Sequence, residues 1–252
     1  NAVPGWSSPT APRPVEELAA NDPDNVAALV GAVAAEELAR ATMCPAVDRF
    51  GRLDILVNNA GRTLNKPITQ TGVADFGDVL RVNARGNFVQ AREAFGAMEA
   101  GGGGAVVSGS SVVAFETQTA CAAAEEALAQ ITRVLAIEGD RSNAVLPGVI
   151  DADIMEGVVD NGREMLASFG PAHPVVRIGQ PHEVETIAFL ASDAASFLRS
   201  DLRDSASAGS GEAPTRFRDH EHDRLVAAAV PRLDPGYGTD AIEHLYRTGV
   251  VA

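Results

Sequence analysis

A short apolar run that stops at a polar turn is the feature that most restricts how this chain can fold. Leu53 to Val57 reads LDILV, and Asn58-Asn59-Ala60-Gly61 follows it directly. Four to eight apolar residues bounded by turn residues are typical of a strand buried on both faces, as in a parallel sheet. The sequence therefore predicts a buried strand of a parallel sheet that ends at a polar turn.

Other short apolar runs alternate with longer segments of helical periodicity. Pro45 is expected to bend or interrupt the first of these helices, and the pattern of Asn25–Val33 fits either a helix or a buried strand. The alternation predicts an α/β fold, a doubly wound parallel sheet in a three-layer α/β/α arrangement. Helices are expected over Ala34–Arg49, Phe76–Met98, Ala120–Ile137 and His182–Ser192, and further strands over Ala105–Ser108 and Asn143–Leu146.

Composition narrows the class of protein. The chain has 252 residues, of which 46% are apolar, and its formal net charge is −14. This length fits a single α/β domain over residues 1–252. The negative charge disfavours nucleic acids and anionic membrane surfaces as partners, and no apolar run approaches the roughly 18 residues that span a bilayer. The two cysteines lie far apart, and no secretory signal is evident, so a reducing, cytoplasmic location is expected.

Several stretches resemble the short-chain dehydrogenase/reductase family. Asp48 to Gly61 (DRFGRLDILVNNAG) ends in that family's Asn-Asn-Ala-Gly signature, and Arg177 to Phe197 resembles its late helical region. Val106 to Val113 (VVSGSSVV) resembles the family's serine strand, and Asn143 to Gly148 (NAVLPG) its Pro-Gly turn. The resemblance implies a Rossmann-like fold, a small carbonyl or alcohol substrate, NAD or NADP as cofactor, and a homodimer or homotetramer.

The resemblance also assigns cofactor contacts. Asn59, Ala60 and Gly61 match the segment that lies near the adenosine ribose in the family, and Pro147 and Gly148 match the turn near the nicotinamide. The family's adenine-binding Asp and its nicotinamide-binding Thr are replaced by Ala32 and Ala152. No acidic residue marks the end of a second strand, so the choice between NAD and NADP stays open.

The catalytic positions depart further from the family. Asn83 matches its structural asparagine and Ser111 its carbonyl-polarising serine. The positions of the proton-donating Tyr and of the Lys four residues later hold Cys121 and Glu125. A carboxylate cannot supply the positive charge of the lysine, so we expect the usual chemistry to be impaired.

The family's first β-α-β unit is missing from the beginning of the chain. Residues 224–252 resemble it, because a strand at Leu225–Val230 precedes a turn with Gly236 and Gly238 and then a helix at Thr239–Tyr246. Such a turn binds a pyrophosphate group. We expect a circular permutation in which Arg199–Asp223 is a linker between the former termini. The alternative is a truncated domain with an unrelated tail.

Three functions remain open at this point. The first is an NAD(P)-dependent oxidoreductase with altered catalytic residues, and the second is an inactive binding or scaffold protein that keeps the fold. The third is a non-redox enzyme that uses Ser111 with Cys121 or Glu125. A damaged or artificial sequence is a further explanation for so many changed signature positions. His220 and His222 lie in a polar loop, where solvated side chains are commoner than metal ligands, so no metal site is expected.

Overall fold

A parallel sheet forms the centre of the protein. The computed structural model describes residues 29–111, 116–139, 141–152, 161–173, 175–198 and 202–204. Within these residues, four strands lie side by side in the order β1-β2-β3-β4, and every pairing is parallel. The strands are β1 (Ile55–Asn58), β2 (Ala105–Gly109), β3 (Arg141–Leu146) and β4 (Leu202–Asp204). The predicted α/β class and the parallel sheet are confirmed.

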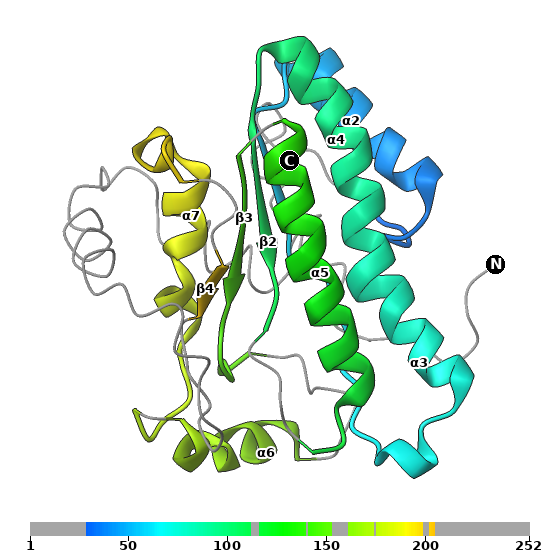
Figure 1. Cartoon of the computed structure of the whole chain (residues 1–252), viewed down its shortest axis with the longest axis vertical. Helices are drawn as coiled ribbons and strands as arrows, with labels where there is room; N and C mark the ends of the chain where they lie inside the picture. Colours follow the sequence, from blue (N-terminus) through cyan, green and yellow to red (C-terminus); the bar gives the residue numbers. More distant parts are fainter. Residues whose placement is uncertain are drawn as a thin grey trace.

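Helices cover both faces of the sheet (Figure 1). On one face, α4 (Asn87–Gly101) packs against β1, and α5 (Thr119–Glu138) packs against β3. On the other face, α7 (Thr186–Ala191) packs against β2 and β3. Helix α2 (Glu36–Phe50) contacts α4, and α3 (Val73–Leu80), which continues through a π-helical turn into α4, contacts α5. A short helix, α6 (Gly162–Ser168), follows β3 in the chain.

The core is divided by the sheet. Strands β2 and β3 are mostly buried, with Val106 and Val107 at 0% exposure, whereas Ile55 at the start of β1 is 41% exposed. Small residues allow close approach on the α4 face: a Cβ on Gly104 would lie 2.6 Å from Met98 Sδ and 2.8 Å from the Asp54 carbonyl oxygen. One cluster therefore joins α2, α4, β1 and β2, and a second joins α7 to β2 and β3.

Arg141 fastens α7 to the sheet. Its guanidinium group donates hydrogen bonds to the backbone carbonyls of Leu190, Ala191, Ser192 and Ala195 at 2.8–3.2 Å. The carbonyls at the end of a helix have no partner within the helix and carry a partial negative charge, so a cation there is stabilising. The first residue of β3 thereby fixes the position of α7.

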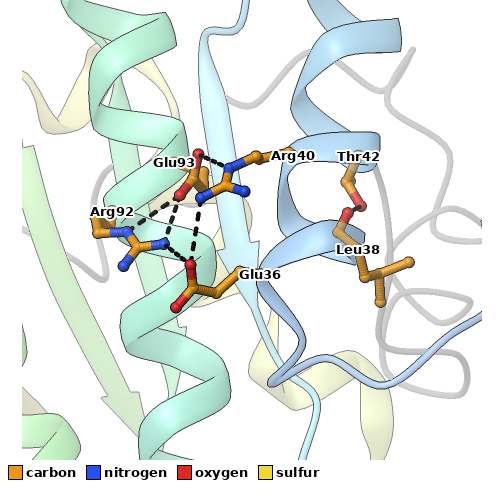
Figure 2. A network of polar contacts seen from close by, with 6 residues as sticks. All are labelled: Glu36, Leu38, Arg40, Thr42, Arg92 and Glu93. Atoms are coloured by element: carbon orange, nitrogen blue, oxygen red, sulfur yellow. Dashed lines mark hydrogen bonds and ion pairs between the residues drawn. The ribbon is translucent and has the colours of Figure 1, made fainter.

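The outer helix α2 is held to α4 by a network of charged side chains (Figure 2). Arg92 contacts Glu36 at 3.2 Å and Glu93 at 2.6 Å, while Arg40 contacts Glu36 at 3.3 Å and Glu93 at 3.6 Å. Each exposed pair contributes about 1 kcal/mol or less, but the shared geometry fixes the two helices relative to each other.

Most predicted elements are confirmed, with small changes at their ends. The long stretch Phe76–Met98 forms α3, a π-helical turn at Arg81–Gly86, and α4. Pro45 was expected to bend or interrupt the first helix, but α2 continues through it to Phe50, so an interruption is wrong. Packing of Met43 and Ala46 against the core outweighs the one backbone hydrogen bond that proline removes.

Three other predictions need correction. Residues 29–33 form neither a helix nor a strand. The segment His182–Ser192 is a 3₁₀ turn at Pro181–Val184 followed by α7, and not one continuous helix. The linker prediction for Arg199–Asp223 is wrong for Leu202–Asp204, which pairs with Ala144–Leu146 of β3, because backbone pairing with a sheet needs no apolar periodicity.

We predict that replacing Val176 by Gly stabilises the protein. Val176 has a φ of 56°, a left-handed conformation that costs a β-branched residue about 1–2 kcal/mol. Its side chain is 70% exposed, so little apolar contact is lost. The free energy of unfolding, measured in urea, should rise by about 1 kcal/mol. Val175 is similarly exposed at 66%, and Val175→Gly should instead lower stability by about 0.5–1 kcal/mol. Equal effects of the two variants would contradict this explanation.

Candidate functional site

Polar residues gather where the parallel strands end. Asn58 at the end of β1 is paired with Ser108 of β2, so the segments that follow both strands emerge at the same edge of the sheet. The two segments lie close together, since a Cβ on Gly109 would be 2.9 Å from Asn59 Oδ1. Asn59, Ala60 and Gly61 follow β1 at this edge, where open α/β sheets bind their ligands.

Glu125 connects three elements at this edge. It lies on α5, where its Oε2 accepts a hydrogen bond from the Ser110 hydroxyl at 2.8 Å. Its Oε1 accepts a bond from the side-chain amide of Asn83 at 3.4 Å. Ser110 directly follows β2, and Asn83 lies in the π-helical turn, a kind of irregularity often found at functional sites. The structure thus brings together two predicted site residues, Asn83 and Glu125.

The environment of Glu125 favours its neutral form. Burial raises the pKa of this carboxyl above its usual value, and the hydrogen bonds from Ser110 and Asn83 offset only part of the increase. Loss of solvent penalises a charge, whereas donors stabilise it. Glu125 is nevertheless only half-buried, so a bound molecule could approach it.

Asn83 is held in place by the backbone that follows β1. Its Oδ1 accepts a hydrogen bond from the Arg62 amide at 2.9 Å, and its Nδ2 donates one to the Arg62 carbonyl at 3.0 Å. The side chain of Asn87 donates to the Asn83 carbonyl, and that of Asn58 donates to the Asn87 carbonyl at 3.3 Å. These buried amides fix the π-helical turn relative to the end of β1.

Cys121 occupies a more enclosed position than Glu125. The side chain is 4% exposed and belongs to an apolar cluster with Val79, Ala120 and Ala124. Its Sγ lies 3.8 Å from the Thr63 hydroxyl oxygen and 4.0 Å from the Leu64 carbonyl oxygen. Cys121 is therefore a buried small residue among apolar neighbours.

Sequence reasoning missed two residues of this edge. Ser110, and not its neighbour Ser111, contacts Glu125, while Ser111 is half-buried beside it. His173 is 3% exposed. Its Nε2 accepts a hydrogen bond from the Val149 amide at 3.0 Å, and its Nδ1 donates to the Phe169 carbonyl at 2.9 Å. The loop after Pro147-Gly148 is therefore held by a histidine 24 positions away, a distance that no local pattern reveals.

Some predicted features fall outside the described residues. They include Gly236 and Gly238, the strand predicted at Leu225–Val230, the helix predicted at Thr239–Tyr246, and the histidines His220 and His222. Among the residues that the structure does describe, no three metal-ligating side chains form a group. No helix in the same part of the chain is long and apolar enough to cross a membrane.

Known proteins of one family resemble the chain. A family model described as Enoyl-(Acyl carrier protein) reductase matches residues 7–201. Cis-4-hydroxycyclohexanecarboxylate dehydrogenase of Sinomonas cyclohexanicum is 37% identical over 186 residues, which cover 70% of this chain and 68% of that protein. A 3-oxoacyl-(acyl-carrier-protein) reductase of Staphylococcus aureus is 32% identical, with 73% of this chain and 76% of that protein covered.

Solved structures agree with these relatives. Levodione reductase superimposes with a TM-score of 0.64 at 29% identity, covering 71% of this chain and 74% of that chain. A gluconate 5-dehydrogenase from Burkholderia cenocepacia, solved in complex with NADP and tartrate, gives a TM-score of 0.61 at 28% identity. That match covers 69% of this chain and 71% of that chain.

We predict that replacing Glu125 by Gln changes how stability depends on pH. A carboxyl whose pKa is raised by folding does not lower stability below about pH 4.3, where it is protonated in both the folded and the unfolded protein. Stability is lost as pH rises through the folded-state pKa, because the buried group must then ionise. Glu125→Gln removes this loss.

The free energy of unfolding should therefore rise relative to the unmodified protein between about pH 4.3 and neutral pH. Urea titrations at several pH values measure the difference. Glu126→Gln is the matched control, because Glu126 is exposed on the same helix. A difference that is constant with pH would contradict the prediction.

Proposed function

The chain belongs to the short-chain dehydrogenase/reductase family of oxidoreductases, and we propose that it is an NAD(P)-dependent enzyme acting on a small carbonyl or alcohol substrate with altered catalytic residues. One observation carries the proposal: Glu125, Asn83 and Ser110 meet at the carboxyl edge of the sheet, where the family's catalytic residues are expected. The relatives' names support the substrate class, since they act on hydroxyl or keto compounds.

The described residues fit one half of a nicotinamide cofactor. The backbone of Asn59–Gly61 follows β1 and the Pro147–Gly148 turn follows β3, so both lie at the carboxyl edge of the parallel sheet, which binds dinucleotides in such folds. The half-buried carboxyl of Glu125 can accept hydrogen bonds from ribose hydroxyls. The phosphate-binding half depends on Gly236 and Gly238, which remain a prediction. When bound, the cofactor supplies the hydride chemistry, and NAD or NADP remains open.

Each residue at this edge has a distinct proposed role. Ser111 would polarise the carbonyl or alcohol oxygen, as the matching serine does in the family. Asn83 orients Glu125 and fixes the Arg62 backbone. His173 keeps the loop after Pro147-Gly148 in position through the Val149 amide. Cys121, enclosed by apolar neighbours, is poorly placed to give a proton to a substrate, so turnover is expected to be slow.

A catalytically inactive binding or scaffold protein is the alternative. The observation in its favour is that a carboxyl stands where the family has a lysine, while the tyrosine position holds a buried thiol. Retained cofactor binding without turnover would favour this alternative. Loss of cofactor binding would favour a non-redox use of Ser111 and Glu125.

Assembly and location extend the proposal. We expect a homodimer or homotetramer formed through α4 and α5, because both helices expose large apolar side chains. These are Phe88 at 46%, Val134 at 50% and Ile137 at 83% exposure. Both cysteines are free thiols, which fits a cytoplasmic location.

The circular permutation is also proposed. Within the described residues, β1 pairs on one side only, with β2, so its other edge can accept another strand. The strand predicted at Leu225–Val230 would add there, and its following turn would then reach the same carboxyl edge. The single domain over residues 1–252 would be completed in this way.

We predict that the protein binds NADH or NADPH with a dissociation constant in the micromolar range and that Gly236 and Gly238 are required. Titration followed by nicotinamide fluorescence measures the affinity. Side chains at a phosphate-binding turn block the approach of the backbone to the pyrophosphate. The double variant Gly236→Val with Gly238→Val should therefore weaken binding at least about tenfold.

The matched control for this variant is Gly209→Val with Gly211→Val, which has the same spacing within the predicted linker. The control should bind as the unmodified protein does. Equal loss in both double variants would contradict the permutation, and no binding at millimolar cofactor would contradict the oxidoreductase proposal itself.

We further predict that Cys121→Tyr combined with Glu125→Lys raises the rate of alcohol oxidation. The change restores a proton donor and acceptor beside a cation that lowers its pKa, and general acid–base catalysis contributes about 10²–10⁴-fold. Oxidation of cis-4-hydroxycyclohexanecarboxylate, the compound named for a relative, is followed by absorbance of the reduced cofactor. The control is Cys44→Tyr with Glu126→Lys, both on exposed positions. A variant that binds cofactor yet gains no activity would show that Cys121 and Glu125 do not occupy the positions of the family's Tyr and Lys.

A further inference from the structure

Glu125 places an ionisable carboxyl, which is negative once it loses its proton, where the family resemblance predicts a positive charge. Its two carboxyl oxygens accept hydrogen bonds from the Ser110 hydroxyl at 2.8 Å and from the Asn83 amide at 3.4 Å. Both donors are neutral groups. They satisfy lone pairs of the carboxylate, but they leave its net charge in place when the group is ionised.

The position of Glu125 makes this charge effective. The residue is half-buried and contacts Ser110 after β2 and Asn83 of the π-helical turn, so water screens it less than it screens the exposed Glu126 on the same helix. The oxidised nicotinamide ring carries one positive charge, whereas the reduced ring is neutral. Any charge at this edge therefore acts differently on the two redox forms of the same cofactor.

We infer that Glu125 makes this site bind the oxidised nicotinamide cofactor in preference to the reduced one. The inference rests on the proposed function, and it adds the redox state that the site selects. At an effective dielectric constant of about 20, unit charges several ångströms apart interact strongly enough to change a binding constant about tenfold or more. A lysine at the same position would have the opposite sign of effect.

The preference suits alcohol oxidation. Ionised Glu125 would accept the hydroxyl proton of an alcohol through the Ser110 hydroxyl, which donates to Glu125 Oε2 at 2.8 Å, and would become a neutral carboxylic acid. A bound oxidised cofactor would supply the matching hydride acceptor. Burial, which raises the pKa of Glu125, makes this carboxylate a better proton acceptor than an exposed one.

The overall charge of the protein acts in the same direction and must be separated from the local effect. At −14, the chain disfavours the more negative reduced cofactor at long range. Glu125→Gln and Glu126→Gln change the net charge equally, yet only the first alters the charge at the sheet edge. Comparing these two variants isolates the local contribution.

The experiment measures dissociation constants of NAD⁺, NADH, NADP⁺ and NADPH by calorimetry at about pH 8. The ratio of the reduced to the oxidised constant is compared in the unmodified protein, Glu125→Gln, Glu125→Lys and Glu126→Gln. Repeating the titrations at about 0.5 M salt removes most of the long-range contribution. Thermal unfolding verifies that each variant is folded, and Glu125→Gln, which has nearly the same size, carries the test if Glu125→Lys does not fold.

The ratio should fall about tenfold in Glu125→Gln, fall further in Glu125→Lys, and stay within about twofold in Glu126→Gln. A ratio in Glu125→Gln that equals that of the unmodified protein would overturn the inference, as would an equal change in Glu126→Gln. In either case, a protein that still binds the cofactor would remain consistent with the proposed function. If the unmodified protein bound none of the four cofactors, both the inference and the proposed function would be overturned.

Discussion

Parallel pairing of β1, β2 and β3 is the constraint on which the rest of the structure depends. Because the strands run in one direction, the segments after Asn58, Gly109 and Leu146 all leave the sheet at one edge. Each return to the opposite edge requires a crossover, and the helices α4 and α5 provide it. Close packing at Gly104 and the hydrogen bonds of Arg141 hold these crossovers and α7 against the sheet. A site at the carboxyl edge follows from this geometry.

Glu125 shows how such an edge tolerates an unfavourable residue. Partial burial of a carboxyl costs free energy unless donors satisfy it. Ser110 and Asn83 supply two, and Asn83 is itself fixed by the Arg62 backbone. The result is a carboxyl acceptor, Glu125, whose charge when ionised can interact with a bound molecule. The same framework that orients a lysine in the family therefore supports a group of opposite charge.

Local patterns predicted the elements better than the contacts between them. The runs ending at Val57, Ser108 and Leu146 gave strands within two residues of those observed, since apolar continuity is a local property. Pro45 and the segment after Arg199 misled the prediction, because core packing and strand pairing override local preference. The resemblance to the family singled out Asn83 and Glu125, which the structure places in contact, but no pattern indicated that Ser110 would bond to Glu125.

The sequence by itself determined the α/β class, the succession of strands and helices, and the family. These properties follow from periodicity and from contiguous motifs such as Asn58 to Gly61. Only the tertiary structure decided that Ser110 and Asn83 both bond to Glu125, that Cys121 is enclosed, and that His173 holds Val149. The physical reason is that hydrogen bonds and burial are fixed when distant segments pack together. Partners separated by 15, 24 or 42 positions leave no periodic signal along the chain.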